Sequence, residues 1–269
     1  MTLPDPSTFL AAGASAEVFR LGDGRVLKLF HAGIDPGIVA REYAIAQAVQ
    51  ATDLPVAPVW GMQDAAGRQG IVYGEIEGPS LLDYVRRRPH RLPWALNAMA
   101  RLQQQIHAQR VPIARSRKRI LAEDIAASTV NARLREAAIE RLDWLNEPDR
   151  LSHGDLHLAN LIVTPGGLAV IDWSKAARAS PAADVARSEM LMRFGPGGSD
   201  DRWHAMARDG AAAYYLWRYQ RRTGLAVEAL VAWRALVALA WARHRLPGRD
   251  AAFAAYLDTA LRQAGFPPL

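Results

Sequence analysis

The chain has 269 residues, of which half are hydrophobic and 22% are charged, and its formal net charge is +6. This length is sufficient for a sizeable hydrophobic core in one or two lobes, and the composition is typical of a soluble globular protein. No apolar run approaches the roughly 20 residues of a membrane span, which argues against an integral membrane protein. The sequence contains no cysteine, so disulfide scaffolds, thiolate metal sites and cysteine nucleophiles are excluded.

The N-terminal segment does not indicate a secretory protein. Ala14-Ser15-Ala16 is similar to a signal-peptidase site, but the residues before it include Asp5 and no Lys or Arg, and the apolar stretch is too short. We therefore expect a cytoplasmic protein without a signal peptide.

The positive charge is concentrated in the C-terminal part of the chain. From residue 173 onward there are 14 Lys and Arg against 8 Asp and Glu, so the first 172 residues are neutral. A basic region attracts anionic partners, although solvated faces of Arg-rich helices explain the excess equally simply, and we favour that explanation. There is no low-complexity arm and no nucleic-acid-binding module, so a nucleic-acid partner is not expected.

The first predicted element is a β-hairpin. Val18–Leu21 and Arg25–Phe30 flank Gly22-Asp23-Gly24, a strong hairpin signal. The preceding residues 11–17 are mostly small, which would let backbone amides approach a bound anion. This segment contains a single glycine, Gly13, so alone it is a weak signal of an anion-binding loop.

Lys28, inside the second predicted strand, is the most informative residue of this region. The chain has 3 lysines and 30 arginines, so a lysine in an apolar strand suggests that a compact ammonium is required there. An ammonium is a point charge on a flexible stem and suits a phosphate contact, whereas a guanidinium is a broad planar fork. The alternative is a strand-edge lysine whose ammonium lies in water.

The next elements follow from periodicity and turn signals. Ile38, Ile45 and Val49 recur at helical spacing and predict a helix over residues 36–50. Strands are predicted over 56–60 and 71–78, and Ser80 and Asp83 form a capping-box-like helix start.

Further helices are predicted in the second half of the chain. They cover residues 80–87, 93–107, 121–146, 200–222, 226–245 and 249–264. The basic run 115–119 is expected to be a solvated linker, with a mobile substrate-side loop as the alternative, and residues 195–199 are expected to be a flexible connector. The aromatic residues of the last three helices are expected to be mostly core.

Residues 151–173 carry the strongest functional signal. Leu161–Val163 and Leu168–Ile171 predict a hairpin, which would bring Asp155 and Asn160 close to Asp172 at one end. Carboxylate and amide oxygens suit Mg²⁺ and its phosphate partner. Asp-x-x-x-x-Asn followed by a carboxylate after a hairpin is the arrangement of kinase catalytic loops. The alternative is an ordinary loop with a turn residue after a strand.

Three stretches together resemble the aminoglycoside phosphotransferase family. Residues 153–160 read HGDLHLAN, residues 170–173 read VIDW and residues 181–186 read PAADVA. The likeness is strongest over 151–187, looser over 11–80, and fades after about residue 190. Choline kinase and other small-molecule kinases share this protein-kinase-like fold.

The resemblance implies an α+β bilobal fold. A small β-rich nucleotide-binding lobe, including the hinge, would span residues 1–78, and a larger, mainly helical lobe for catalysis and acceptor binding would span residues 79–269.

The resemblance also implies roles for the polar residues. Asp155 would accept the proton of the acceptor hydroxyl, and Asn160 and Asp172 would hold Mg²⁺. Lys28 would contact the phosphates of ATP (or GTP), and Glu42 would pair with Lys28. A glutamate solvated on a helix surface is the alternative for Glu42.

Other residues would support these groups. Gly13 and Ser15 belong to the loop over the phosphates, and adenine would bind the backbone near Glu75 and Glu77. His153 is expected to brace the catalytic loop by hydrogen bonds rather than to bind metal. Asp184 would accept a hydrogen bond from the backbone of that loop, with simple helix capping as the alternative.

Two departures from protein kinases argue against a protein substrate. Gly154 stands where protein kinases have an arginine that pairs with a phosphorylated activation loop. Only 12 positions separate Asp172 from Asp184, which leaves no room for a long activation segment.

The sequence therefore predicts a kinase that transfers the γ-phosphate of ATP to a hydroxyl of a small acceptor, as a monomer or weak dimer. The alternatives are a nucleotide-binding pseudokinase acting as a scaffold, and a kinase for a lipopolysaccharide sugar or another large anionic acceptor. The basic excess after residue 173 argues against a polycationic aminoglycoside as the natural acceptor.

Overall fold

The structure, a computed structural model, describes residues 4–195, 201–242 and 250–269. The chain divides into two compact units. The first comprises Met1–Tyr84 and Ala159–Ser174, and the second comprises Val85–Leu158 and Lys175–Leu269. The first unit thus contains a segment from far along the chain, and the division at residues 78 and 79 stays a prediction.

The first unit is built on a five-stranded antiparallel sheet in the order β1-β2-β3-β5-β4. The strands are β1 (Phe9–Ala12), β2 (Ala16–Gly22), β3 (Arg25–Phe30), β4 (Val59–Ala65) and β5 (Arg68–Gly74), preceded by the short 3-10 helix Pro6–Thr8. The predicted β2–β3 hairpin is confirmed, and Gly22, Asp23 and Gly24 in its turn all have positive φ, which favours glycine.

The two later strands are displaced from their predicted positions of 56–60 and 71–78. Ala66 and Gly67 both have positive φ and form a tight turn, which pairs Ala65 with Arg68 and sets the register of β4 and β5. Strand β4 therefore starts at Val59 rather than at residue 56. Strand β5 ends at Gly74, so residues 75–78 lie beyond it.

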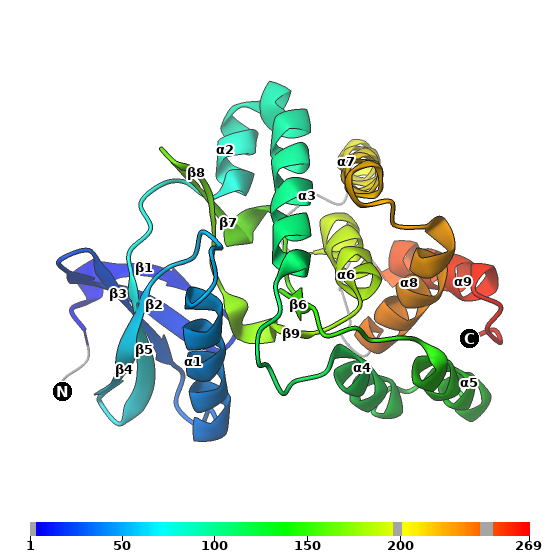
Figure 1. The fold of residues 1–269 in the computed structure, drawn as a ribbon, viewed down its shortest axis with the longest axis horizontal. Coiled ribbons are helices and arrows are strands. Elements are labelled where there is room, and N and C mark those ends of the chain that lie inside the picture. Colours follow the sequence, from blue (N-terminus) through cyan, green and yellow to red (C-terminus); the bar gives the residue numbers. More distant parts are fainter. Residues whose placement is uncertain (1–3, 196–200, 243–249) are drawn as a thin grey trace. The chain divides into compact units, whose positions relative to one another are not determined.

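Helix α1 (Pro36–Gln50) has the predicted bounds and packs against β4 and β5 (Figure 1). Asp35 caps its N-terminus by accepting a 2.6 Å hydrogen bond from the backbone of Gly37. The buried face contains Val39, Ile45 and Val49, whereas Ile38, predicted to lie on that face, is exposed.

The predicted hairpin near residues 161–171 is also confirmed. Strands β7 (Leu161–Thr164) and β8 (Gly167–Val170) pair antiparallel. The hairpin joins the first unit through backbone hydrogen bonds from Val163 to Pro79 (3.0 Å) and from Val170 to Pro55 (2.8 Å). Residues after β8 are therefore positioned by the first unit.

The second unit is mainly helical. Its helices are α3 (Leu92–Ala108), α4 (Arg117–Ala126), α5 (Ala132–Trp144), α6 (Pro181–Phe194), α7 (Arg202–Thr223), α8 (Val227–Trp241) and α9 (Asp250–Gln263). Helix α2 (Leu81–Arg87) spans the boundary between the units, and the capping contact predicted at its start forms: Ser80 Oγ accepts from the Asp83 amide at 3.0 Å. The short strands β6 (Leu151–Ser152) and β9 (Ala177–Arg178) pair with each other.

Helix α6 lies at the centre of this unit, packed against α7 and α8 (Figure 1). Ten of its residues are buried, including Asp184, Ser188 and Glu189. Polar side chains buried in a helix need partners, and the partners of Asp184 are described below.

The single helix predicted over residues 121–146 is wrong, because the chain breaks it at residues 127–131. Ser128 Oγ donates back to Ile125 O (2.7 Å) and Asn131 Oδ1 accepts from the Leu134 amide (2.9 Å). Side chains that bond the local backbone favour such ends over a continuous helix.

The prediction of a solvated linker at residues 115–119 is also wrong. Ser116 caps α4, Arg117 is only 4% exposed, and the ammonium of Lys118 donates to the backbone oxygen of Leu145 (2.8 Å). This basic run therefore belongs to the folded second unit.

Two further predictions concern the C-terminal half. Of the connector predicted at 195–199, residues 196–199 lie outside the described residues. Tyr215, Tyr219 and Trp233 are core residues as predicted, whereas Trp203 and Trp217 are exposed. No helix in the described part of the chain is long and apolar enough to cross a membrane.

Candidate functional site

Three of the predicted site residues meet in the first unit. The ammonium of Lys28 on β3 lies 2.6 Å from a carboxylate oxygen of Glu42 on α1 and 3.0 Å from one of Asp172, two residues after β8. The Lys28 side chain is 15% exposed, so it does not extend into water as the alternative required. Glu42 is buried rather than solvated.

The electrostatics of this group favour a charged lysine. Burial lowers the pKa of Lys28, but the carboxylates of Asp172 and Glu42 outweigh that effect and raise it above the usual value. The Tyr73 hydroxyl lies 3.5 Å from the same oxygen of Glu42 that Lys28 contacts. Lys28 is therefore held as a cation in a fixed position.

Asp172 has an unusual backbone conformation. Its φ of 59° lies in the left-handed region, which non-glycine residues rarely adopt. Such a conformation costs on the order of 1–3 kcal/mol and persists where the surrounding structure imposes it, often at functional sites. At the same place the Ile171 amide donates to the Asn160 carbonyl at 3.0 Å, which brings the two ends of the hairpin together.

Asn160 and Asp172 provide oxygen ligands that fit Mg²⁺. Mg²⁺ is usually bound by one or two protein side chains and completes its shell with water and substrate phosphates. Among the described residues there is no cluster of three or more His, Cys, Asp or Glu that could hold a metal alone. The donor set therefore suits a metal that arrives with a phosphate.

The small-residue loop lies between β1 and β2. The Gly13 amide donates to the Ala16 carbonyl (2.8 Å), and the Ser15 carbonyl accepts from the His31 amide (2.9 Å). The His31 ring also contacts the Gly13 carbonyl at 3.2 Å. His31 was not predicted from the sequence, since a single histidine after a strand carries no distinguishing pattern.

The predicted adenine segment is engaged with the sheet. The Glu75 side chain forms an ion pair with Arg20, which lowers the pKa of Glu75. The Glu75 amide donates to the Gly24 carbonyl at 2.7 Å, so this amide is occupied in the structure. Glu77 is exposed.

The remaining predicted residues meet in the second unit. His153 is fully buried, and its Nδ1 lies 3.2 Å from the amide of Asp155. The Asp155 carboxylate lies 3.3 Å from the guanidinium of Arg187 on α6. The loop that carries Asp155 is thus bonded to its own histidine and to a helix.

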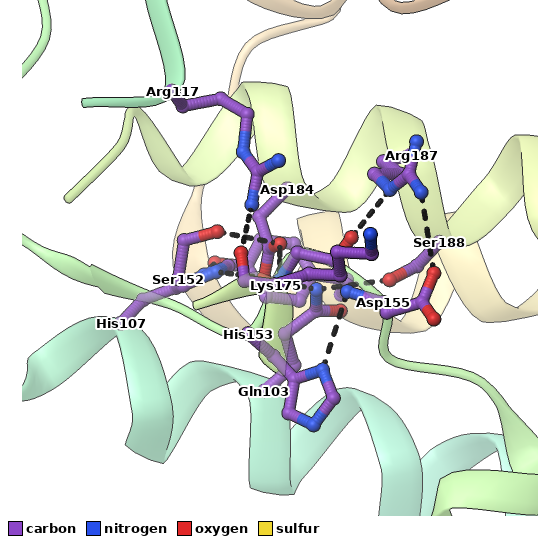
Figure 2. A network of polar contacts seen from close by, with 12 residues as sticks. Gln103, His107, Arg117, Ser152, His153, Asp155, Lys175, Asp184, Arg187 and Ser188 are labelled. Carbon is purple, nitrogen blue, oxygen red and sulfur yellow. Dashed lines mark hydrogen bonds and ion pairs between the residues drawn. The ribbon is translucent and has the colours of Figure 1, made fainter. Parts of the chain in front are cut away.

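Asp184 is the centre of a buried hydrogen-bond network (Figure 2). One of its oxygens accepts from the Ser152 hydroxyl and the Gly154 amide, both at 2.7 Å. The other lies 2.9 Å from Gln103 Nε2 and 3.0 Å from His107 Nε2. The carboxylate therefore bonds the loop backbone, and capping of α6 is not its main contact.

These hydrogen bonds keep Asp184 ionised despite its burial. Burial by itself raises the pKa of Asp184, but hydrogen bonds, foremost from His107, hold it well below its usual value. The network fixes the backbone of residues 152–154 against α3 and α6.

Sequence reasoning missed several residues that surround the loop carrying Asp155. They include Gln103, His107, Arg117 and Arg187. A signal existed for Arg187, which follows Asp184 by three residues and so shares its helix face. The other contacts depend on tertiary structure.

The sequence matches the model of a family described as "Phosphotransferase enzyme family" over residues 7–225. The match extends past residue 190, where the motif resemblance was predicted to fade. A comparison with curated proteins finds no match.

Solved structures with similar folds include small-molecule kinases. An aminoglycoside phosphotransferase from Streptomyces rimosus, in complex with ADP and streptomycin, is 21% identical with a TM-score of 0.62, covering 88% of this chain and 94% of that one. A choline kinase from Cryptosporidium parvum is 13% identical with a TM-score of 0.56, covering 98% and 93%. These similarities confirm the predicted α+β, protein-kinase-like fold.

Proposed function

The chain belongs to the phosphotransferase enzyme family, and we propose that it transfers the γ-phosphate of ATP to a hydroxyl group of a small molecule. The observation that carries the proposal is the placement of Lys28 between Glu42 and Asp172. A lysine paired with a helix glutamate, beside a carboxylate that follows a hairpin, is the nucleotide-positioning arrangement of kinases.

In this proposal the first unit binds the nucleotide. Lys28 contacts the phosphates, and Glu42 keeps its ammonium oriented. Asn160 and Asp172 hold Mg²⁺, which supplies positive charge against the phosphate oxygens. The loop with Gly13 and Ser15 covers the phosphates. The backbone of residues 75–77 would bind adenine, and GTP is the alternative nucleotide.

The catalytic loop supplies the general base. Asp155 orients the acceptor hydroxyl and takes its proton, since a positioned carboxylate is a suitable general base. His153 and Asp184 fix the loop that carries Asp155.

The proposed acceptor is a small hydroxyl compound. One related kinase described above is bound to streptomycin and another is named for choline, so a screen of acceptors includes both chemical classes. The basic excess after residue 173 supports an acceptor that is not polycationic, or one that carries negative charge. A cytoplasmic location and a monomeric or weakly dimeric state stay predictions.

The test is an ATP-consumption screen with aminoglycosides, macrolides, choline-like amines, sugars and homoserine, each with Mg²⁺. At least one acceptor should raise ATP consumption, and Asp155→Asn should lower kcat roughly 10²–10⁴-fold. Asp149→Asn, an exposed aspartate just before β6, is the matched control and should leave kcat unchanged.

Two results would count against the proposal. Thermal stabilisation by Mg²⁺ and ATP without phosphorylation of any acceptor would favour the pseudokinase. Full activity of Asp155→Asn would show that another group receives the proton.

A further inference from the structure

Two side chains of helix α6 form hydrogen bonds with the backbone amide and the backbone carbonyl of Gly154 in the catalytic loop. The amide of Gly154 donates to the carboxylate of Asp184 at 2.7 Å. The carbonyl of Gly154 accepts from Nε of Arg187, one turn further along the helix (Figure 2). Residues three apart lie on the same helix face, so one face of α6 fixes this peptide in position and direction.

The same arginine reaches the next residue. Its second nitrogen, Nη2, lies 3.3 Å from the carboxylate of Asp155. Both side chains are largely shielded, with 18% of Arg187 and 24% of Asp155 exposed. A planar guanidinium can bond a carbonyl and a carboxylate at once, which an ammonium cannot do in the same geometry.

A second arginine, Arg117, lies against the α-carbon of Gly154. The guanidinium of Arg117 on α4 occupies the space where a Cβ on Gly154 would lie, and it donates to the backbone oxygen of Lys175 at 2.6 Å. Burial and the nearby charge of Arg187 lower the pKa of Arg117 to about 10. Gly154 itself has a φ of 77°, which favours glycine.

These contacts act on two different features of the loop, its backbone path and the side-chain torsions of Asp155. The backbone path is determined by Asp184, by Arg117 and by the φ of Gly154, and these three do not set the side-chain torsions. The contact of Arg187 Nη2 with the carboxylate acts on those torsions directly.

We propose that Arg187 is a positioning residue, which orients the Asp155 carboxylate for proton transfer from the acceptor. The inference rests on the proposed role of Asp155 as the base. A misplacement of about 1 Å in a reacting group can cost roughly 10²-fold in rate, so loss of this contact should appear in kcat.

The experiment compares Arg187→Gln, Arg187→Lys and Arg193→Gln. Arg193 is a matched control because it lies on the same helix, is 19% exposed, and pairs with Glu189 and Asp209 rather than with the loop. Rates are measured with ATP, Mg²⁺ and the acceptor found by the screen, or with water as acceptor.

We expect Arg187→Gln to lower kcat roughly 10²-fold while the KM for ATP stays within about twofold. Arg187→Lys should lose less, because an ammonium keeps one of the two contacts. Arg193→Gln should keep the wild-type kcat, whatever its effect on thermal stability.

A double variant tests whether Arg187 acts through Asp155. If it does, Asp155→Asn combined with Arg187→Gln should be no slower than Asp155→Asn alone. Independent, multiplying losses would overturn the proposal and show that Arg187 only supports the fold.

The outcomes also distinguish this inference from the proposed function. Wild-type kcat in Arg187→Gln, together with an inactive Asp155→Asn, would overturn the positioning role and leave the base assigned. Wild-type kcat in Asp155→Asn would overturn the assignment of the base itself. If Arg187→Gln does not fold, the same comparison is made with Arg187→Lys.

Discussion

The carboxylate of Glu42 lies 2.6 Å from the ammonium of Lys28, and both side chains are largely buried. We expect Lys28→Met to lower kcat/KM for ATP roughly 10²–10³-fold, the range seen when one preorganised donor to developing charge is removed. Steady-state kinetics measure the effect. Arg25→Met, on the same strand but paired with the exposed Asp23, is the control. Equal losses in both variants would indicate damage to the sheet rather than a lost phosphate contact.

Asp172→Asn should remove the dependence of nucleotide binding on Mg²⁺, because a neutral amide is a weaker ligand for this hard cation. At a ligand concentration of about 100 Kd, binding stabilises a protein by about 2.7 kcal/mol, which is readily detected as a rise in Tm. The wild type should show this rise with ATP and Mg²⁺ together, and the variant should not. Asp64→Asn, an exposed aspartate on β4, should behave as the wild type. An unchanged metal effect in Asp172→Asn would mean that other groups bind the ion.

Gly154→Ala should destabilise the protein by about 2–6 kcal/mol, combining a strained positive φ with the clash against Arg117. Gly210→Ala is the contrasting control, because Gly210 lies in the exposed middle of α7 with open space around its Cβ position. That variant should gain about 0.5–1 kcal/mol from helix propensity. Both are measured by urea unfolding, and equal stability of the two variants would contradict the described packing at Gly154.

Asp184→Asn should destabilise the protein at neutral pH by about 2–3 kcal/mol, because it weakens hydrogen bonds to a charged acceptor. The pKa of Asp184 is depressed in the folded state, so its contribution is complete above the ordinary value of 3.8 and is lost as the pH falls below it. The difference in unfolding free energy between wild type and variant should therefore stay constant from pH 6 to about pH 4 and shrink as the pH is lowered further to 3. With the exposed Asp149→Asn the difference should be small throughout. A gap that stays constant to pH 3 would show that Asp184 is not held ionised.

The parts of the fold that the sequence predicted carry local signals. Asp35 and Pro36 mark the start of α1, and Gly22-Asp23-Gly24 marks a turn that requires positive φ. The hairpin after Asn160 is bounded by turn residues in the same way. Lys28 was identified because it is one of only 3 lysines among 33 basic residues and lies in an apolar strand.

The parts that were wrong or missed depend on contacts distant in sequence. Helical periodicity continues through residues 127–131, although Ser128 and Asn131 bond the local backbone and end the helices there. Charge alone suggested that residues 115–119 are solvated, since nothing local shows that Arg117 meets the carbonyl of Lys175. The contact between Arg187 and Asp155 likewise exists only once α6 packs beside the loop.

The first unit has a consequence for biosynthesis, because residues 159–174 complete it long after Tyr84. While the ribosome synthesises the intervening residues, the carbonyls of Pro55 and Pro79 cannot yet form their hydrogen bonds with the amides of Val170 and Val163. The N-terminal sheet can form early, yet Lys28 meets Asp172 only when residue 174 has left the exit tunnel. A nascent chain stalled before that point would lack the Lys28–Asp172 pair of the proposed nucleotide site, and a chain truncated after residue 84 would never form it.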